Sequence, residues 1–370
     1  MAVTMEKRKN RYGHSLAFLL SALAIAAGMI AGPSGGAAVA APSTRMIVDR
    51  TGRSVRIPSH PEHIACLFGP SYEKLLALGA ADRVAIVPNL TLPWNDRLNP
   101  HLRKIPTIGN YAAPSVEQLM ALGVDLVIYH PFAKQIERMS ASGLPVVVAY
   151  DGSRRSTTLE AFIADWYGQI RFYGDVLGGQ AKTTAEAYCR YVDRRIQPVL
   201  AVTRTIPAAN RPRVFYICGR IQGISNTQSR FSTADWLVDA AGGRMLTHDD
   251  AAYFVTVTTE ELIAWDPEII VVGTSATTDV ITGDPRFQGI TAVKTGRVVV
   301  SPKGQFYWSH FSSESFLCIL FLAKQFHPDR FADIDLTGEL TSYYENFYHY
   351  SLTDDEARRI LNHLPPAGEE

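Results

Sequence analysis

The sequence predicts an α/β protein that consists of two Rossmann-like lobes joined by a long bridging helix. Its 370 residues exceed what one ordinary hydrophobic core accommodates, because domains usually hold about 100–200 residues. Short apolar strands alternate with helices, which is typical of parallel sheets covered by helices. In addition, a helix–strand pattern in the first half of the chain recurs in the second half, on the far side of a long helical stretch.

The composition excludes several classes of protein. Thirty-six Lys and Arg residues balance 36 Asp and Glu residues, so the chain lacks the basic excess of a nucleic-acid-binding protein. With 46% hydrophobic and 19% charged residues, it also lacks the signature of a disordered chain. A single window near the N-terminus is apolar enough to enter a membrane, which excludes a multi-span transporter.

Residues 1–40 have the pattern of a secretory signal peptide. Basic residues come first, an apolar run from Ser15 to Gly32 follows, and Ala38-Val-Ala40 provides a small-x-small cleavage site. The alternative is an uncleaved anchor, because the run nearly reaches the roughly 20 residues that a spanning helix needs. Cleavage would remove four basic residues and one acidic residue. The mature chain would then be mildly acidic and free in a periplasm.

The first lobe is predicted over residues 44–155. It opens with a β-hairpin around Thr51-Gly52. A short apolar strand, His63–Phe68, leads into a helix, Tyr72–Leu78, and Val84 begins the next strand. This alternation is the basis for a parallel, helix-covered sheet in the lobe.

An internal repeat links the two lobes. Residues Ser115–Ile128 match Thr258–Val271 without gaps, and each copy reads as a capped short helix, an acidic turn and an apolar strand. Any two helix–strand units look somewhat alike, but the matching order along a whole lobe favours two related lobes. The identical mates are Glu117/Glu260, Leu119/Leu262 and Ala121/Ala264.

Residues 157–205 form the predicted bridging region. An amphipathic helix spans Leu159–Leu177, and Gly178-Gly179 interrupts the helical pattern. A second helix runs from Gln180 to at least Gln197, and Pro198 is expected to kink or end it. Some 18 residues extend roughly 27 Å at about 1.5 Å per residue, which is long enough to join two small lobes.

The second lobe is predicted over residues 211–330 and a C-terminal helical tail over residues 331–370. Val214–Cys218 reads as a strand, and Gly219–Ser232 as a polar loop. The next helix, Thr233–Ala241, ends at a glycine pair. The lobe therefore repeats the strand–helix order of the first.

Buried free thiols are the favoured interpretation of the cysteines. An exported chain could oxidise them, but a disulfide framework needs denser spacing in a smaller protein. No C-x-x-C pair occurs, and a zinc site is unsupported. The four are Cys66, Cys189, Cys218 and Cys318.

The familiar catalytic and nucleotide-binding motifs are missing from the sequence. It contains no P-loop, no dinucleotide-binding fingerprint, no H-E-x-x-H and no G-x-S-x-G. His, Cys and Asp show no metal-ligand spacing. We therefore predict no cofactor, no metal centre and no catalytic residue, although a constellation assembled across loops stays open.

Loops that follow the strands are the predicted ligand site, because open α/β sheets bind ligands at the carboxyl ends of their strands. These loops are rich in Tyr, Trp, His and Arg and poor in carboxylates. Aromatic rings give rigid contact area, and Arg or Tyr can hydrogen-bond an anionic ligand, so a planar or chelate-like ligand fits better than a small sugar. The candidate ligand-binding residues are Tyr72, Tyr111, His130, Arg220, Tyr253, Tyr307, Trp308 and His310.

Several candidates have an alternative structural interpretation. Tyr72 at a helix start can pack inward, and His130 before a proline can cap a strand. The triplet Phe306–Trp308 cannot face one side of a strand, so at least one member belongs to the core. Arg220 follows a strand and a glycine, where a buried cation would be costly, and this favours the cleft.

Five stretches between about residues 44 and 330 carry a family pattern. They are Val48–Pro58, Pro61–Ile64, Gly69–Ser71 with Leu75–Gly79, Ser115–Leu119 with Asp125–Ile128, and Asp235–Gly243. With these stretches in this order, the mature chain resembles the periplasmic substrate-binding proteins that serve ABC importers of iron siderophores, haem and cobalamin. The tail segment Phe347–Asp354 resembles an extension found in some chelate-binding members.

The resemblance implies a helical-backbone metal-chelate binding protein, in which one long helix bridges two α/β lobes and the ligand lies in the groove with little hinge motion. It also implies one acidic residue on each lobe that docks to Arg on the permease. The matching positions are Glu117 in the first lobe and Asp239 in the second, where Glu is more usual. Each also has an ordinary interpretation as a solvated helix acid.

Residues and resemblance together predict a periplasmic solute-binding protein without chemistry of its own. It would act as a monomer, capture an iron siderophore or similar metal chelate, and deliver it to the permease dimer of an ABC importer at the inner membrane. The alternatives within the class are a corrinoid, haem, or a nickel or cobalt chelate with His130 and His310 as ligands. An exported metal-dependent enzyme on a bilobal scaffold is the alternative from another class.

Overall fold

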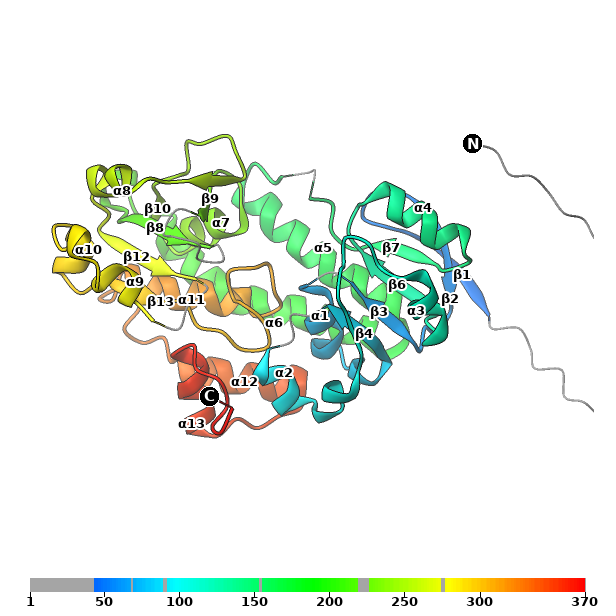
Figure 1. Cartoon of the computed structure of the whole chain (residues 1–370). Coiled ribbons are helices and arrows are strands. Elements are labelled where there is room, and N and C mark those ends of the chain that lie inside the picture. The colour runs from blue at the N-terminus through cyan, green and yellow to red at the C-terminus, as the bar shows by residue number, and fades with distance from the viewer. Residues whose placement is uncertain are drawn as a thin grey trace, which may run out of the picture. The chain divides into compact units, whose positions relative to one another are not determined.

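Two helix-covered sheets, one parallel and one mixed, organise the computed structural model (Figure 1). The structure describes residues 43–67, 69–88, 92–152, 155–218, 226–273 and 277–369. It confirms the predicted α/β class with two lobes, whereas the predicted signal peptide lies outside the described residues. None of the helices in these ranges combines the length and the apolar character that a bilayer span requires.

The first lobe contains the predicted hairpin and a five-stranded sheet. The hairpin pairs β1 (Thr44–Val48) with β2 (Ser54–Pro58) in antiparallel fashion. In the sheet, the strand order is β5-β4-β3-β6-β7 and every pairing is parallel. The strands are β3 (Ile64–Cys66), β4 (Val84–Pro88), β5 (Thr107–Ile108), β6 (Leu126–Tyr129) and β7 (Val146–Val148). The helices and 3₁₀ turns are α1 (Ser71–Ala77), η1 (Ala81–Arg83), α2 (Pro93–Leu98), η2 (Pro100–Lys104), α3 (Val116–Ala121) and α4 (Ala133–Ala141).

The second lobe has a mixed sheet in which the order is β11-β9-β8-β12-β13 and β10 pairs with β8. Its strands are β8 (Arg213–Ile217), β9 (Asn226–Gln228), β10 (Arg244–Met245), β11 (Phe254–Thr256), β12 (Ile269–Val272) and β13 (Val298–Val300). The predicted polar loop 219–232 is wrong in part, because β9 lies within it and pairs with β8 and β11. The helices are α7 (Thr233–Ala240), α8 (Thr259–Trp265), α9 (Asp279–Thr282), η4 (Pro285–Phe287), α10 (Thr291–Lys294) and α11 (Ser315–Phe326).

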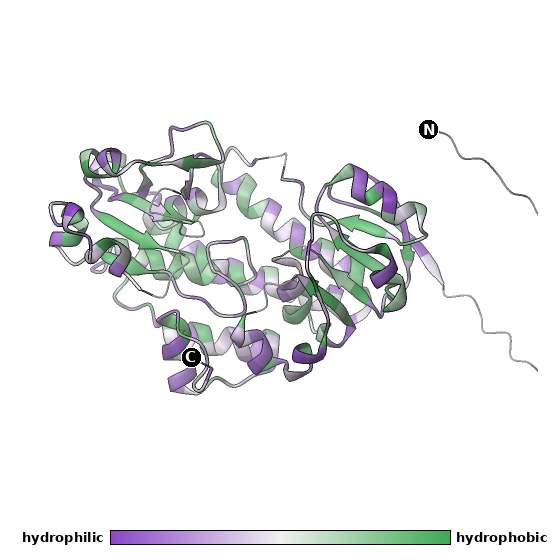
Figure 2. Ribbon diagram, in the orientation of Figure 1, coloured by the Kyte–Doolittle hydropathy of each residue, from purple (hydrophilic) through white to green (hydrophobic). Residues whose placement is uncertain are grey.

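The internal repeat is present in the structure as well as in the sequence. The hydroxyl oxygen of Ser115 accepts a hydrogen bond from the Gln118 amide at the start of α3. Thr258 caps α8 in the same way. Both helices lead into strands, β6 and β12, that are buried along their whole length. In Figure 2 both strands have the hydrophobic colour, which agrees with helices covering the sheets.

Two long helices, α5 (Leu159–Leu177) and α6 (Gly179–Thr203), join the lobes. Gly178, in a left-handed conformation at φ +70°, separates them as the sequence predicts. They pack closely, since a Cβ placed on Gly174 would lie 2.7 Å from the Cβ of Ala185. Pro198 does not end α6, because the burial of Leu200 and its neighbours offsets the one backbone donor that proline removes.

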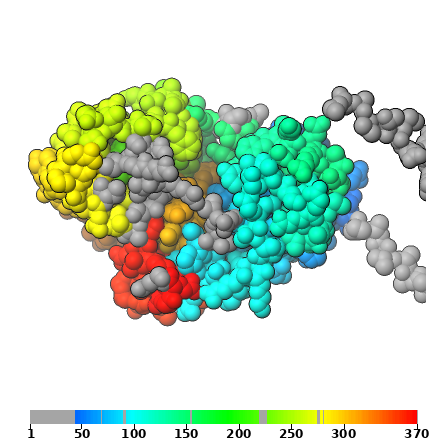
Figure 3. Space-filling view, in the orientation of Figure 1, coloured from blue at the N-terminus to red at the C-terminus, as the bar shows by residue number. Residues whose placement is uncertain are grey.

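The C-terminal tail contacts both lobes. It follows the second lobe and contains α12 (Leu336–Tyr348) and α13 (Asp354–Leu361). The short turn η3 (Ala208–Asn210) lies earlier in the chain, between α6 and the second lobe. The Trp94 indole N–H in the first lobe donates to the Leu364 carbonyl at 2.9 Å, and His363 Nδ1 lies 2.7 Å from the Ser301 carbonyl oxygen in the second. Figure 3 shows the tail against first-lobe residues. The tail is thus a second connection between the lobes, beside α6.

All four cysteines are free and buried, in agreement with the favoured prediction. Burial raises the pKa of the Cys66 and Cys318 thiols to about 12 and that of Cys189 to about 11. These thiols therefore stay protonated at neutral pH and contribute to the core as small apolar side chains.

Candidate functional site

A cavity of about 300 Å³ lies at the carboxyl ends of the first-lobe strands and is lined on the other side by second-lobe residues. Each strand of the first sheet supplies a lining residue shortly after or at its end, as the parallel topology requires. From the first lobe these are Gly69, Pro70, Pro88, Tyr111, His130 and Tyr150. The second lobe supplies Gln228, Thr233, Tyr253, Phe254, Phe306, His310 and Phe311.

Aromatic side chains dominate the lining, and none of its described residues carries a formal charge at neutral pH. The Phe311 ring packs against Tyr150 from the opposite lobe, with ring centroids 5.8 Å apart. The guanidinium of Arg155 lies 5.0 Å from the centroid of the Tyr253 ring, on the edge of the site. Such a surface can sandwich a flat or bulky ligand and hold it with a few hydrogen bonds.

Two imidazoles face this cavity, one from each lobe. His130 follows β6 and stacks on Phe132, with ring centroids 5.2 Å apart. His310 follows β13, and its Nδ1 lies 3.0 Å from the Ser309 hydroxyl oxygen. Burial lowers the pKa of each histidine from 6.5 to about 4. Both are therefore neutral at pH 7, the form that can coordinate a metal.

The structure brings together half of the predicted ligand-binding residues. Tyr111, His130, Tyr253 and His310 line the cavity. Tyr307 is half-buried and packs on the His310 ring, outside the lining. The position of Arg220 lies outside the described residues.

Tyr72 and Trp308 belong to the core rather than the lining, which corrects their predicted placement. Both side chains are 0% exposed. The Tyr72 hydroxyl donates to Asn95 Oδ1 at 2.9 Å, because the tyrosine at this helix start points inward. Of the Phe306–Trp308 triplet, Phe306 faces the cavity and Trp308 the core, so the expectation that at least one member is buried is confirmed.

Several lining residues were missed. Tyr150 follows the predicted strand 145–149, so the same carboxyl-end rule could have found it. Gln228 and Thr233 carry no distinguishing sequence signal. Phe311 reaches the cavity from a left-handed backbone conformation, φ +56°, that a sequence does not reveal for a residue other than glycine.

Beneath the cavity, a buried carboxyl holds the loop that carries Phe306. Glu314 accepts hydrogen bonds from the Phe306 amide at 3.0 Å and from the Tyr344 hydroxyl at 2.5 Å. Glu314 also lies close to the backbone of Gly304, because a Cβ added to this glycine would lie 2.3 Å from Glu314 Oε1. Desolvation raises the pKa of Glu314 from 4.5 to about 8, so this group is mostly protonated at neutral pH.

Replacing Glu314 by Gln is expected to change how stability depends on pH. The raised pKa of Glu314 means that its stabilising contribution is complete below pH 4.5 and is lost as the pH rises through about 8. The free energy of unfolding of the natural protein should therefore fall between pH 6.5 and 8.5, by at most about 1.4 kcal/mol per pH unit. Urea unfolding at several pH values measures this slope.

The pH window avoids the buried histidines, whose lowered pKa values of about 4 give an opposite slope below pH 6.5. Glu345→Gln, at an exposed carboxylate of α12, is the matched control and should keep the slope. Equal slopes for Glu314→Gln and the natural protein would contradict the assigned role.

The two predicted docking acids differ in their surroundings. Glu117 is exposed on α3, and its carboxylate accepts a hydrogen bond from the hydroxyl of Ser115 in its own cap at 3.0 Å. Asp239 is held by Arg211, with Nη1 and Oδ1 2.6 Å apart. Glu260, the repeat mate of Glu117, is exposed at the corresponding position of α8.

A family model described as periplasmic binding protein matches residues 64–304, and the chain belongs to this family. This confirms the resemblance to binding proteins of ABC importers. One relative is the molybdate-binding protein MolA of Haemophilus influenzae, 25% identical over 347 residues, which cover 85% of this chain and 94% of MolA.

Solved structures share the fold. MolA bound to molybdate superposes with a TM-score of 0.74 at 22% identity, covering 84% of this chain and 99% of MolA. A periplasmic solute-binding protein from Veillonella parvula superposes with a TM-score of 0.72 at 24% identity, covering 86% of this chain and 97% of the Veillonella chain. CeuE of Helicobacter pylori with Ni(II) bound superposes with a TM-score of 0.68 at 17% identity, covering 86% of this chain and 99% of CeuE.

Proposed function

We propose that this periplasmic binding protein captures a compact metal chelate and presents it to the permease of an ABC importer. One observation carries the proposal: a cavity between the lobes combines aromatic walls with one neutral imidazole from each lobe. The aromatic walls would hold the organic part of the chelate, and His130 and His310 would complete the coordination of its metal.

The donor set favours a chelate over a free ion. No cluster of three or more His, Cys, Asp or Glu side chains that could hold a metal ion occurs among the described residues. Two imidazoles alone leave most coordination positions of a transition metal unfilled, so the ligand must bring the others. A volume of about 300 Å³ lies at the lower end of ligand sites and favours a small chelate over a corrinoid or haem.

A molybdate-like oxyanion is the second candidate, because the relative MolA is named for binding molybdate. The hydroxyls of Tyr150, Tyr253 and Thr233 and the amide of Gln228 could donate hydrogen bonds to such an anion. Against it stands the lack of a cationic side chain in the described lining, because oxyanion sites usually offer charge-assisted donors.

Titration calorimetry on the mature protein tests the proposal. The ligands to compare are ferric catecholate and hydroxamate siderophores, nickel–histidine, haemin, cobalamin, sodium molybdate and the free metal ions. We expect one-to-one binding of a chelate and weak or no binding of free ions. Binding of molybdate alone would favour the second candidate, and turnover of a substrate without chelate binding would overturn the assignment.

Delivery would use matching points on the two lobes. Glu117 and Glu260 occupy equivalent positions of the internal repeat, and each has an exposed apolar residue one turn further along its helix. These neighbours, Met120 and Ile263, are 57% and 43% exposed and are themselves repeat mates. A permease dimer with an Arg and an apolar contact on each half would match both points. We propose Glu260 in place of Asp239, which Arg211 already neutralises.

Replacing Glu117 or Glu260 by Ala should therefore spare ligand binding and impair delivery. Losing one charge pair at the interface should weaken stimulation of the importer's ATPase by about tenfold or more, and the double variant should abolish it. The assay is ATP hydrolysis by the reconstituted importer with the loaded binding protein. Glu137→Ala, at an exposed acid of α4, is the matched control. If Asp239→Ala impairs the stimulation of the ATPase and Glu260→Ala does not, Asp239 is the docking residue of the second lobe.

A further inference from the structure

We infer that the buried pair Glu73 and Lys74 is a positioning clamp, which fixes the two walls of the ligand cavity relative to each other and thereby sets ligand affinity. The inference rests on the proposed binding function of the cavity. Both side chains are fully buried, and neither lines the cavity. Their effect on a ligand would therefore act through the residues they hold.

Lys74 links residues of the two lobes. Its ammonium donates to Glu73 Oε1 at 2.9 Å, to the Pro70 carbonyl at 3.0 Å and to the Phe311 carbonyl at 2.8 Å. Pro70 lines the cavity from the first lobe and Phe311 lines it from the second. All three ammonium hydrogens thus form hydrogen bonds. Two of these bonds go to cavity-lining residues that are far apart in the sequence.

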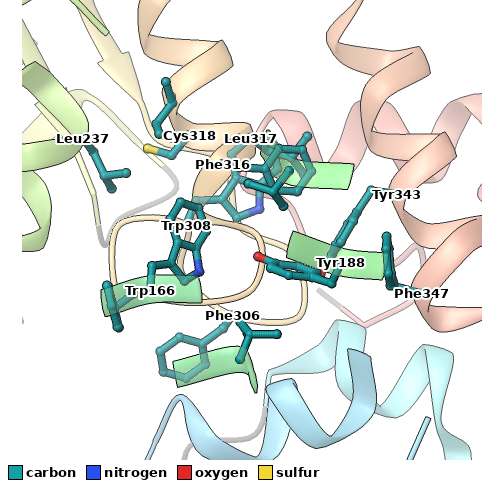
Figure 4. Close-up of a cluster of buried hydrophobic side chains, with 14 of the residues drawn as sticks. Trp166, Tyr188, Leu237, Phe306, Trp308, Phe316, Leu317, Cys318, Tyr343 and Phe347 are labelled. Carbon is teal, nitrogen blue, oxygen red and sulfur yellow. The ribbon is translucent and has the colours of Figure 1, made fainter. Parts of the chain in front are cut away.

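Glu73 extends this connection through Ser313. Its carboxylate accepts hydrogen bonds from the Ser313 amide at 3.0 Å and from the Ser313 hydroxyl at 2.6 Å. Ser313 in turn accepts from Tyr188 of α6 at its carbonyl, 2.6 Å, and from Tyr343 of α12 at its hydroxyl, 2.8 Å. Figure 4 shows these two tyrosines in the same buried cluster as Phe306. The clamp is therefore fastened to the bridging helix and to the tail.

The backbone of Phe311 shows what the clamp has to hold. At φ +56° this residue adopts the left-handed conformation, which is unfavourable for a side chain with a Cβ and persists only where the surroundings impose it. The Lys74 bond to its carbonyl is one such constraint. In this conformation the Phe311 ring faces the cavity and packs on Tyr150 of the first lobe.

Burial of the charges supports a positioning role. A buried ion pair is seldom more stabilising than well-packed apolar residues of similar volume, because both charges lose their hydration. What the pair provides here is directed bonds to defined atoms on two lobes. An apolar pair at the same place would fill the space without fixing Pro70 to Phe311.

The decisive variant is the double substitution Glu73→Met with Lys74→Met, which removes both charges together with every hydrogen-bonding group of the pair and so leaves no unpaired ion in the core. Hydrogen exchange of the Ser313 amide, followed by mass spectrometry on the segment 306–316, reports on the clamp without any ligand. We expect faster exchange in this segment and unchanged exchange in β6 and β12. Unchanged exchange at Ser313 would overturn the clamp even if the cavity binds its ligand.

Affinity for two probes, nickel–histidine and sodium molybdate, is the second measurement. For whichever probe the natural protein binds, the double variant should bind roughly tenfold more weakly. Lys324→Met is the matched control, since Lys324 also donates to two carbonyls, Ala332 and Ile334, far from the cavity lining. Equal losses in both variants would contradict a positioning role.

Ser313→Ala covers the case in which the double variant does not fold. It keeps both charges and the amide bond to Glu73, and it removes the hydroxyl that donates to Glu73 and accepts from Tyr343, so we expect a smaller local increase in exchange and a loss of roughly threefold in affinity. Failure of the natural protein to bind either probe would count against the proposed ligand class, while the exchange measurement would still decide the clamp.

Discussion

Replacing Trp308 by alanine is expected to lower the free energy of unfolding by about 3–5 kcal/mol, a large part of the 5–15 kcal/mol typical of a folded domain. The Trp308 side chain is 0% exposed and lies among Trp166, Phe316 and Leu317 in the main hydrophobic cluster (Figure 4). The cavity left by the indole cannot be filled by these neighbours, because they belong to two separate helices, α5 and α11. Urea unfolding with a calorimetric check measures the loss.

Trp308→Phe separates packing from ligand contact. Phenylalanine keeps most of the buried apolar area, and the indole N–H has no hydrogen-bond partner among the described residues, so little polar interaction is lost. We expect a decrease in stability well below that of the alanine variant and an unchanged affinity. A loss of affinity in a stable Trp308→Phe protein would instead support the sequence-based prediction that Trp308 contacts the ligand.

Replacing both His130 and His310 by alanine should weaken chelate binding by about 100-fold or more, since each lost metal–imidazole contact corresponds to roughly tenfold. The two residues line the same cavity from different lobes, so the single variants should each show part of the loss. Titration calorimetry measures the loss of affinity, with whichever chelate the natural protein binds in the ligand comparison described above. His60→Ala, at an exposed histidine, is the control. Full affinity in the double variant would exclude coordination by these residues.

The pH dependence gives an independent test of the same two histidines. Burial lowers the pKa of both to about 4, so their metal-binding neutral form persists as the pH falls through 6.5. Chelate binding should remain intact at pH 5.5 and decline toward pH 4. A decline centred near pH 6.5 would show that exposed, ordinary histidines control binding.

Sequence reasoning located the cavity because the carboxyl-end rule depends only on strand order. It therefore found Tyr111, His130, Tyr253 and His310 without any knowledge of distances. It could not place Tyr72 or Trp308, because the direction of a side chain in a loop or at a helix start depends on backbone angles set by tertiary contacts. The Lys74–Phe311 bond joins residues 237 positions apart, and no local pattern predicts it.

The proposed docking acids illustrate a different limit. Motif matching assigned Asp239, and the Arg211 contact that occupies it became visible only in the structure. The internal repeat already paired Glu117 with Glu260, so the information was present in the sequence but was used only for fold class. The choice between Glu260 and Asp239 therefore rests on the ATPase measurement with the two alanine variants.

The tail that ties Trp94 to Leu364 and His363 to Ser301 has a consequence for transport in the cell. With the tail and α6 both joining the lobes, we expect Glu117 and Glu260 to keep nearly the same spacing whether the cavity is empty or filled. An importer that measures this spacing would then dock empty and loaded molecules alike. Empty protein would compete for the permease, so the rate of uptake would depend on the fraction of loaded molecules rather than on their number.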